Sequence, residues 1–208
     1  ASFYITSKKG TRIITDPYKS GAFNGGIGYS EINEEADVVT VSHEHDDHNY
    51  TASIKGKPVI VRGTEEKTVR DVKIKGHKFY HDKTQGSERG TNTIYVMEID
   101  GMRVAHLGDL GHTLTEKDTA GIGKIDILIL PVGGFFTIDA KEAKKVFDLL
   151  KPTVVIPMHY KTSKCGFPIA KVEDFIKQMP NVSKVEGSEI EISNIPSSSI
   201  TYILEPIK

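Results

Sequence analysis

The chain contains 208 residues, of which 38% are hydrophobic and 26% are charged. That length fits one domain or at most two small ones, and the apolar content is sufficient for a core and too high for a disordered chain. The 27 Lys and Arg residues against 28 Asp and Glu give a net charge of -1, which argues against a broadly basic surface and against nucleic acid as a partner.

Short apolar runs separated by Gly, Pro and Asp predict β-strands over the first two thirds of the chain. The β-branched residues of Ala36–Val41 are typical of a buried strand. Asp100-Gly101 predicts a type I′ turn between two later strands. The predicted strands are Phe3–Ile5, Arg12–Thr15, Ala36–Val41, Pro58–Arg62, Val69–Lys75, Thr93–Ile99, Met102–Leu107 and Ile125–Leu130, with a further strand-like stretch at His77–Tyr80.

The hydrophobic period changes to that of a helix after Pro131. Between Asp139 and Leu150, apolar residues recur at i, i+3, i+4 and i+7, and Glu142 follows the N-cap Asp139 at the spacing of a capping box. No repeat, low-complexity tract or linker marks a boundary, so we expect residues 1–208 to form one α/β domain. The remaining predicted elements are a helix at Ile169–Gln178 and strands at Thr153–Pro157, Glu189–Ile192 and Thr201–Leu204.

A single cysteine, Cys165, stands beside eight histidines. One cysteine rules out an internal disulfide framework and a multi-cysteine zinc site, and it favours a reducing compartment. The N-terminal residues become polar at Thr6, before an apolar region of signal-peptide length forms, and no run approaches the ~20 apolar residues of a membrane helix. We therefore expect a cytoplasmic protein without membrane association, whose metal ligands, where present, are imidazoles and carboxylates.

The segment His43-Glu44-His45-Asp46-Asp47-His48 directly follows the strand predicted at Ala36–Val41. In extended backbone, side chains i and i+2 point to one side, so His43 and His45 can converge on one cation. Asp47 and His48 can reach a second cation where the loop curls. Imidazole and carboxylate are the usual ligands of zinc and also suit iron and manganese. A buried strand leading into this loop favours a metal site over a solvated polar turn.

One cation needs three or more ligands, so further ligands must come from distant parts of the sequence. The candidates are His81, Asp109 and His159, each at or near the C-terminal end of a predicted strand, where sites of α/β proteins commonly form. Gly108 lets the backbone approach closely beside Asp109. His77 competes with His81, because residues i and i+4 of a strand point the same way.

The order His43-x-His45-x-Asp47-His48, a lone histidine, Gly108-Asp109 and His159 resembles the metallo-β-lactamase superfamily. The resemblance runs from Phe3 to about Thr162 and implies a four-layer αββα sandwich with metals at one edge of two sheets. Members of the similar branch begin with a short strand and a Gly-His pair, which this chain, opening on Ala1, does not show. The segments that resemble the compact bacterial branch containing L-ascorbate-6-phosphate lactonase-like hydrolases are Asp16-Pro17-Tyr18, His106-Leu107-Gly108-Asp109, Pro131-Val132-Gly133-Gly134 and Met158-His159-Tyr160.

The resemblance implies two divalent cations, with zinc favoured and manganese, iron or nickel as alternatives. It implies that the cations bridge a hydroxide and that Asp47 is catalytic, orienting this nucleophile or taking its proton. It assigns His43, His45 and His81 to one cation, Asp47, His48 and His159 to the other, and Asp109 to a bridging position.

Other polar residues have supporting roles or open ones. His106 lies within a predicted strand and is expected to support the ligands rather than to bind metal. Asp16 either accepts N–H bonds from histidines or simply opens a turn. His112, Tyr160 or water would protonate the leaving group.

These features favour a metal-dependent hydrolase that cleaves an ester, lactone or phosphodiester bond in a small-molecule substrate. The alternatives are a metal-binding or sensing module of the same fold without hydrolytic activity, and a single structural metal. The substrate is expected to be selected by the loops Lys19–Asn33, Lys83–Asn92 and Lys161–Pro168, or by a partner subunit of a homo-oligomer.

Two groups near the expected site remain open. Phe135 and Phe136 either line an apolar pocket or merely pack against the protein. Lys161 and Lys164, close to His159, would attract a phosphate or be solvated loop lysines.

Overall fold

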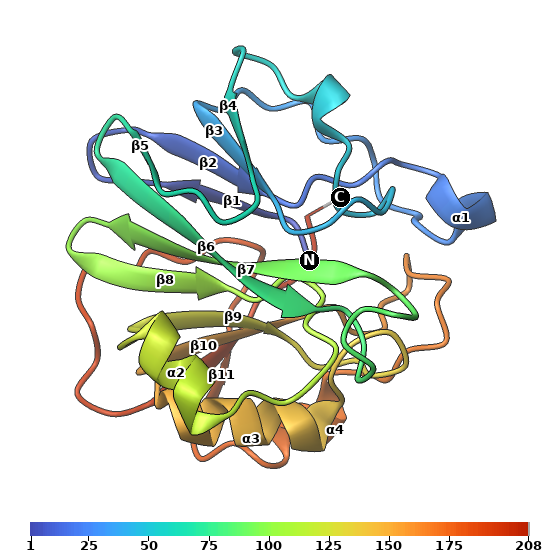
Figure 1. The fold of residues 1–208 in the computed structure, drawn as a ribbon, viewed down its shortest axis with the longest axis vertical. Coiled ribbons are helices and arrows are strands. Elements are labelled where there is room, and N and C mark those ends of the chain that lie inside the picture. Colours follow the sequence, from blue (N-terminus) through green and yellow to red (C-terminus); the bar gives the residue numbers. More distant parts are fainter. Residues whose placement is uncertain (208) are drawn as a thin grey trace.

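Two mixed β-sheets pack face to face in the computed structural model, which describes residues 1–207 (Figure 1). The smaller sheet has four strands in the order β1-β2-β3-β4. β1 and β2 form an antiparallel hairpin, and β3 and β4 continue the sheet in parallel. Its strands are β1 (Phe3–Thr6), β2 (Arg12–Thr15), β3 (Val38–Val41) and β4 (Val59–Arg62).

The larger sheet has eight strands in the order β11-β12-β10-β9-β8-β7-β6-β5. From β5 to β8 neighbouring strands are antiparallel, and from β8 to β11 they are parallel. Parallel strands end at a common edge, so the segments after β8 and β10 leave the sheet on the same side. The strands are β5 (Lys67–Val69), β6 (Val72–Tyr80), β7 (Thr91–Ile99), β8 (Met102–His106), β9 (Ile127–Pro131), β10 (Val154–Met158), β11 (Val182–Lys184) and β12 (Ile200–Ile203).

Helices α2 (Glu116–Ile122), α3 (Ala140–Leu150) and α4 (Glu173–Ile176) cover the outer face of the larger sheet (Figure 1). The outer side of the smaller sheet packs against loop residues such as Ile32 and Ile54. The short helix α1 (Ala22–Gly25) and a single 3₁₀ turn (Thr51–Ser53) belong to these connecting segments. The predicted α/β fold with two sheets in a sandwich is confirmed, with helices over the larger sheet and mainly loops over the smaller one. Within residues 1–207, no helix has the length and apolar character needed to cross a membrane.

Alternation along the strands divides the apolar residues between separate cores. On β3, Val38 belongs to the core between the two sheets, whereas Val39 and Val41 face the loop layer. The central core also contains Tyr95 and Met97 of β7. Because both faces of the inner strands are buried, these strands hold fixed positions, and the loops at their ends can be placed accurately.

Most predicted strands are confirmed within one or two residues, but Val69–Lys75 is wrong as a single strand. The chain turns between β5 and β6, where Arg70 has a positive φ of 53°, and β6 then continues through Tyr80. The turn at Asp100-Gly101 is confirmed, since both residues have the positive φ of a type I′ turn, 53° and 80°.

Three expectations for the C-terminal half also need correction. The helix predicted at Ile169–Gln178 is the shorter α4. Residues 189–192 form no strand, because Ile192 covers the core between the sheets while its backbone stays unpaired. The sequence pattern missed β11, which has three residues, and α2, in which Ile122 is the buried residue.

The predicted capping box of α3 is present and gives a stability test. The Asp139 carboxylate accepts the N–H groups of Lys141 and Glu142 at 2.9 Å, and the Glu142 carboxylate accepts the Asp139 N–H at 3.1 Å. Asp139→Ala should lower the free energy of unfolding by about 1 kcal/mol in urea titrations. Asp148→Ala, at the other end of the helix, is the control and should cost less than about 0.5 kcal/mol. Equal losses would contradict the capping role.

Candidate metal centre

Four segments bring all seven predicted ligands together where strands β3, β6, β8 and β10 end. The histidine-rich loop follows β3, and each of the other segments supplies one ligand within three residues of its strand. The chain therefore needs no helix to build the site. The residues that gather here are His43, His45, Asp47, His48, His81, Asp109 and His159.

The ligand atoms divide into two neighbouring groups. His43, His45 and His81 form the first group. The second contains Asp47, His48, Asp109 and His159, and within each group all the ligand atoms lie within 4.8 Å of one another. This division matches the two sets that the family resemblance implied.

Asp109 lies between the two groups. Its Oδ2 is 3.3 Å from Nε2 of both His81 and His159 and 3.9 Å from Nε2 of His43, and its Oδ1 is 3.2 Å from Nε2 of His48. The residue is 2% exposed. Burial alone would raise the pKa of this carboxyl, but the electrostatic attraction of His159 and His48, with a hydrogen bond from His48, holds it well below its usual range. Asp109 is therefore a buried anion that faces both groups.

The histidines differ in their protonation when no metal is bound. Burial lowers the pKa of His43 to about 3. Burial likewise lowers the pKa values of His81 and His159. Burial also acts to lower the pKa of His48, but the carboxylates of Asp109 and Asp47 outweigh it and hold this pKa well above its usual value. The centre thus presents neutral imidazoles with free lone pairs and one imidazolium.

Several buried atoms of the centre lack hydrogen-bond partners among the described residues. Nε2 of His43 and Oδ1 of Asp109 are two of them. A buried polar atom without a partner typically costs about 1–3 kcal/mol. A cation between the two groups would occupy both atoms and offset this cost. The donor set of nitrogen and carboxylate oxygen therefore fits two divalent cations.

Asp16 orients the histidine-rich loop from beneath. Its Oδ2 accepts the Nδ1–H of His48 at 2.9 Å and the Ser42 hydroxyl at 2.5 Å, and its Oδ1 accepts the Ser42 N–H at 2.8 Å. Ser42 Oγ lies 2.9 Å from Nδ1 of His43. Asp16 thus fixes His48 directly and His43 through Ser42, leaving the Nε2 atom of each ring directed at the centre. The prediction that Asp16 accepts histidine N–H bonds is confirmed.

Asn92 and Ser42 support the centre, and the sequence analysis missed both. Oδ1 of Asn92 accepts the Asp109 N–H at 2.8 Å, and its Nδ2 donates to the Leu107 carbonyl at 2.9 Å. Gly108 has φ 53°, and a Cβ there would lie 2.4 Å from Asn92 Oδ1 and 2.6 Å from Ser42 Cβ. Asn92 falls at the end of the loop Lys83–Asn92, directly before the predicted strand, where an asparagine is ordinary and gives no local signal of its role.

The structure decides between the rival histidines. His77 is half-buried in the middle of β6, opposite Ile94, and belongs to neither group. His106 is fully buried, donates from Nε2 to the Ala1 carbonyl at 2.8 Å and accepts the Gly108 N–H at 3.2 Å. It therefore supports the Asp109 loop, as its position in a strand predicted.

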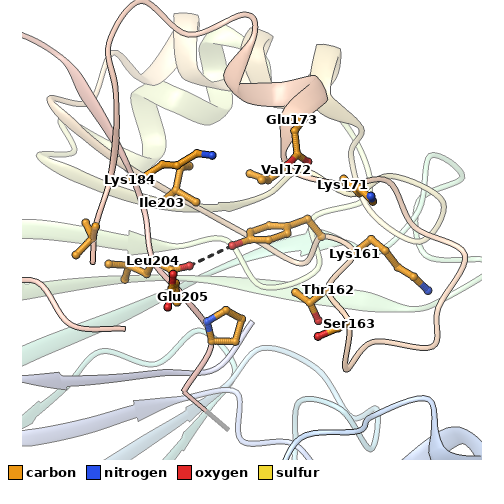
Figure 2. A pocket seen from close by; sticks show the side chains of 13 residues that line it. Lys161, Thr162, Ser163, Lys171, Val172, Glu173, Lys184, Ile203, Leu204 and Glu205 are labelled. Atoms are coloured by element: carbon orange, nitrogen blue, oxygen red, sulfur yellow. Dashed lines mark hydrogen bonds between the residues drawn. The ribbon is translucent and has the colours of Figure 1, made fainter. Parts of the chain in front are cut away.

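The two side chains expected as leaving-group acids have other contacts. The His112 ring packs against Phe79 and Tyr80, and its Nδ1 lies 3.0 Å from the Thr113 carbonyl. The Tyr160 hydroxyl donates to the Leu204 carbonyl at 3.4 Å, toward the C-terminal segment (Figure 2). Burial raises the pKa of Tyr160. Neither contact directs a proton at the ligand groups.

A pocket of about 560 Å³ lies beside Tyr160 (Figure 2). Lys161 contributes to its wall, but the Lys161 ammonium donates to the Phe167 carbonyl at 2.7 Å. Lys164 lies with its Nζ 6.0 Å from the centroid of the Tyr29 ring. Both lysines therefore contact protein groups, which weakens their case as a phosphate site.

Removing the Asp16 charge should weaken metal binding without removing a ligand. We expect Asp16→Asn to lower zinc affinity about 10–100-fold, because His48 and His43 lose the partner that fixes their rings. Competition with a fluorescent chelator measures this affinity. Asp148→Asn on the surface is the control, and an unchanged affinity in a folded Asp16→Asn protein would contradict the role.

The raised pKa of His48 predicts a pH-dependent stability in metal-free protein. A raised folded-state pKa gives stability that is complete below the unfolded value of about 6.5 and is lost as pH rises through the folded value. In the presence of a chelator, the free energy of unfolding should therefore fall as the pH rises above about 6.5 in the wild type and fall less in His48→Gln. His77→Gln should keep the wild-type slope. Equal slopes in wild type and His48→Gln would refute the imidazolium assignment.

Known proteins similar to this chain agree with the fold and with the ligand geometry. Residues 1–159 match the model of the Beta-lactamase superfamily domain. A UPF0173 metal-dependent hydrolase of Pyrococcus abyssi is 31% identical over 92% of this chain and 96% of its own length. A UPF0173 metal-dependent hydrolase of Thermococcus onnurineus is 33% identical over 78% of this chain and 82% of its own length.

A solved structure extends the similarity over nearly the whole chain. It is a Thermotoga maritima protein provisionally described as a Zn-dependent hydrolase of the metallo-β-lactamase superfamily, and it is 38% identical with a TM-score of 0.81. The match covers 98% of this chain and 93% of that protein. The chain therefore belongs to the metallo-β-lactamase superfamily and, within it, to the UPF0173 metal-dependent hydrolase family.

Proposed function

We propose that the chain is a hydrolase that uses two divalent cations, with zinc favoured, to cleave an ester, lactone or phosphodiester bond in a small molecule. The observation that carries the proposal is the buried carboxylate of Asp109, within 3.3 Å of imidazole nitrogens from both ligand groups. The names of the UPF0173 relatives and of the Thermotoga protein support metal-dependent hydrolysis. The resemblance of several segments to lactonase-like hydrolases supports a lactone or related ester.

The side chains divide the work of holding the cations. Three imidazoles, those of His43, His45 and His81, would hold one, and the second group would hold the other, with Asp109 between them. When bound, the two cations would lower the pKa of a water molecule and act as a Lewis acid for the substrate oxygen.

Asp47 is the carboxylate that we assign to orienting the nucleophilic water and accepting its proton. Its side chain is 12% exposed, against 3% for Asp109, so substrate and water reach it more easily. Burial alone would raise the pKa of Asp47, but the charge and hydrogen bond of His48 bring it to about 2. The carboxylate is therefore ionised at neutral pH and can orient a water. So low a pKa makes it a weak base, and it would accept a proton only from a water that a bound cation has made more acidic.

The leaving group then needs a proton. The contacts of His112 and Tyr160 point away from this role. In this proposal Asp47, having accepted a proton, returns it to the leaving group, and solvent is the other source. A cytoplasmic location and a homo-oligomeric state remain predictions of the same proposal.

Two substitutions separate catalysis from metal binding. Asp47→Asn should reduce kcat by at least about 10²-fold, because general-base catalysis contributes about 10²–10⁴-fold, and should retain measurable zinc. Asp109→Ala should lose both zinc and turnover. Zinc is measured by mass spectrometry, and turnover on a panel of lactones, carboxylic esters and phosphodiesters. The exposed neighbour Asp46 provides the control variant Asp46→Asn.

The panel also tests the competing interpretation. A protein that binds two equivalents of zinc and hydrolyses no member of the panel would be a metal-binding or sensing module. Wild-type turnover by the Asp109→Ala protein would contradict the metal-dependent mechanism itself.

A further inference from the structure

A row of four phenylalanine rings lies on the loops near the metal centre. Its neighbouring centroids are 5.5 Å apart for Phe23 and Phe167, 5.6 Å for Phe167 and Phe136, and 4.7 Å for Phe136 and Phe135. Phe23 is 52% exposed and Phe135 is 66% exposed. Exposed apolar side chains that form a contiguous group mark binding surfaces more often than isolated ones do. These four rings are called the apolar row below.

The middle of the apolar row is anchored to the ligand segments. Phe135 and Phe136 follow Gly133, which packs against the His159 backbone so closely that a Cβ would lie 2.2 Å from its carbonyl oxygen. At the other end of the same loop, the Ile138 N–H donates to the Leu110 carbonyl at 2.9 Å, one residue beyond Asp109. The loop of Phe135 and Phe136 therefore connects two ligand-bearing segments.

The ends of the apolar row are anchored in the same way. Phe167 belongs to the segment that leaves β10 through His159. Phe23 lies in the loop that begins at Lys19, whose N–H donates to the Asp46 carbonyl at 2.8 Å, within the histidine-rich loop. Every segment that carries a ring of the row is thus attached to a segment that carries a ligand.

The segment after His81 reaches the apolar row through Arg89. The buried carboxylate of Asp82 accepts the N–H groups of Thr84, Gly86, Glu88 and Arg89 at 2.7–3.0 Å, which fixes this loop. The Arg89 guanidinium then lies 5.7 Å from the centroid of Phe136, a cation–π distance. Phe136 is therefore held in place, while Phe135 beside it stays open to solvent.

Two residues of the apolar row have a backbone conformation that is unfavourable in free energy. Phe23 and Phe135 have φ of 52° and 63°, a left-handed conformation that is disfavoured for bulky residues. Because these side chains are exposed, they bury little surface in the core, and core packing therefore does not offset the free-energy cost of this backbone conformation. Such positions gather at ligand-binding sites.

We propose that the apolar row binds an apolar acyl or aryl group of the substrate, next to the scissile bond held at the metal centre. The inference rests on the proposed function and adds a substrate class to it. The attachment of these loops indicates what the row binds. Each loop that carries a ring is joined to a segment that carries a ligand, so a substrate bound at the ligands would extend over the rings. An ester or lactone with an apolar chain satisfies this geometry, whereas a small, fully polar substrate leaves the row unused.

A series of linear esters tests the apolar row. With zinc-loaded protein, kcat/KM for 4-nitrophenyl acetate, butyrate, hexanoate and octanoate should rise roughly threefold to fourfold per methylene that reaches the row. Phe135→Ala and Phe136→Ala should flatten this rise. Tyr4→Ala is the matched control, because Tyr4 is an aromatic residue 49% exposed on β1. Phe135 is exposed, so its variant should keep the wild-type melting temperature.

A binding series separates this inference from the proposed function. Calorimetric titration with butyrate, hexanoate and octanoate needs no turnover, and the affinity should rise with chain length in the wild type and not in Phe135→Ala. Chain-dependent binding without hydrolysis of any ester would support the row and refute the hydrolase.

Two outcomes would overturn the inference. One is hydrolysis whose rate does not depend on chain length, or whose dependence survives both substitutions. The other is a dimer in size-exclusion chromatography that Phe135→Ala dissociates while the ester and binding series stay unchanged, which would assign the row to contact between two copies of the chain.

Discussion

The burial of one ionised carboxylate, that of Asp109, is the constraint on which the rest of the centre depends. An isolated carboxylate removed from water costs several kcal/mol, so it persists only among positive charges or metal ions. Four imidazoles from three other segments lie 3.2–3.9 Å from its oxygens. The fold must therefore bring four strand ends to one place, and hydrogen bonds from buried side chains such as Asp16 and Asn92 fix the ligand segments there.

The two sheets meet this requirement through their topology. The smaller sheet contributes the histidine-rich loop after β3, and the larger sheet contributes His81, Asp109 and His159 after β6, β8 and β10, with Asp109 after the strand at which the sheet changes from antiparallel to parallel. Asp16 supports the histidine-rich loop of one half and Asn92 supports the Asp109 loop of the other, and the Thr93 N–H joins the halves by donating to the Ser42 carbonyl at 2.9 Å. Gly108 allows this close approach because the side chains of Asn92 and Ser42 fill the space that a Cβ would take.

The loops that carry the apolar row are attached to the segments that carry the ligands. Gly133 packs on the backbone of His159 while its loop carries Phe135 and Phe136. The cation–π contact of Arg89 connects the segment after His81 to the same rings. A substitution in the apolar row is therefore expected to change the position of the reacting groups as well as the affinity for the substrate, because the same loops hold both.

The sequence by itself determined what depends on neighbouring residues. The histidines and aspartates of His43–His48 indicated imidazole and carboxylate ligands. The capping box at Asp139 and Glu142 located α3, and runs of β-branched residues located most strands. Only the tertiary structure decided between His77 and His81, because their spacing in the sequence predicts the same direction for both and the choice depends on where β6 ends relative to the Asp109 loop. Asn92, Ser42 and the apolar row were likewise hidden, since their roles arise from contacts between segments far apart in the chain, and local pattern carries no information about such contacts.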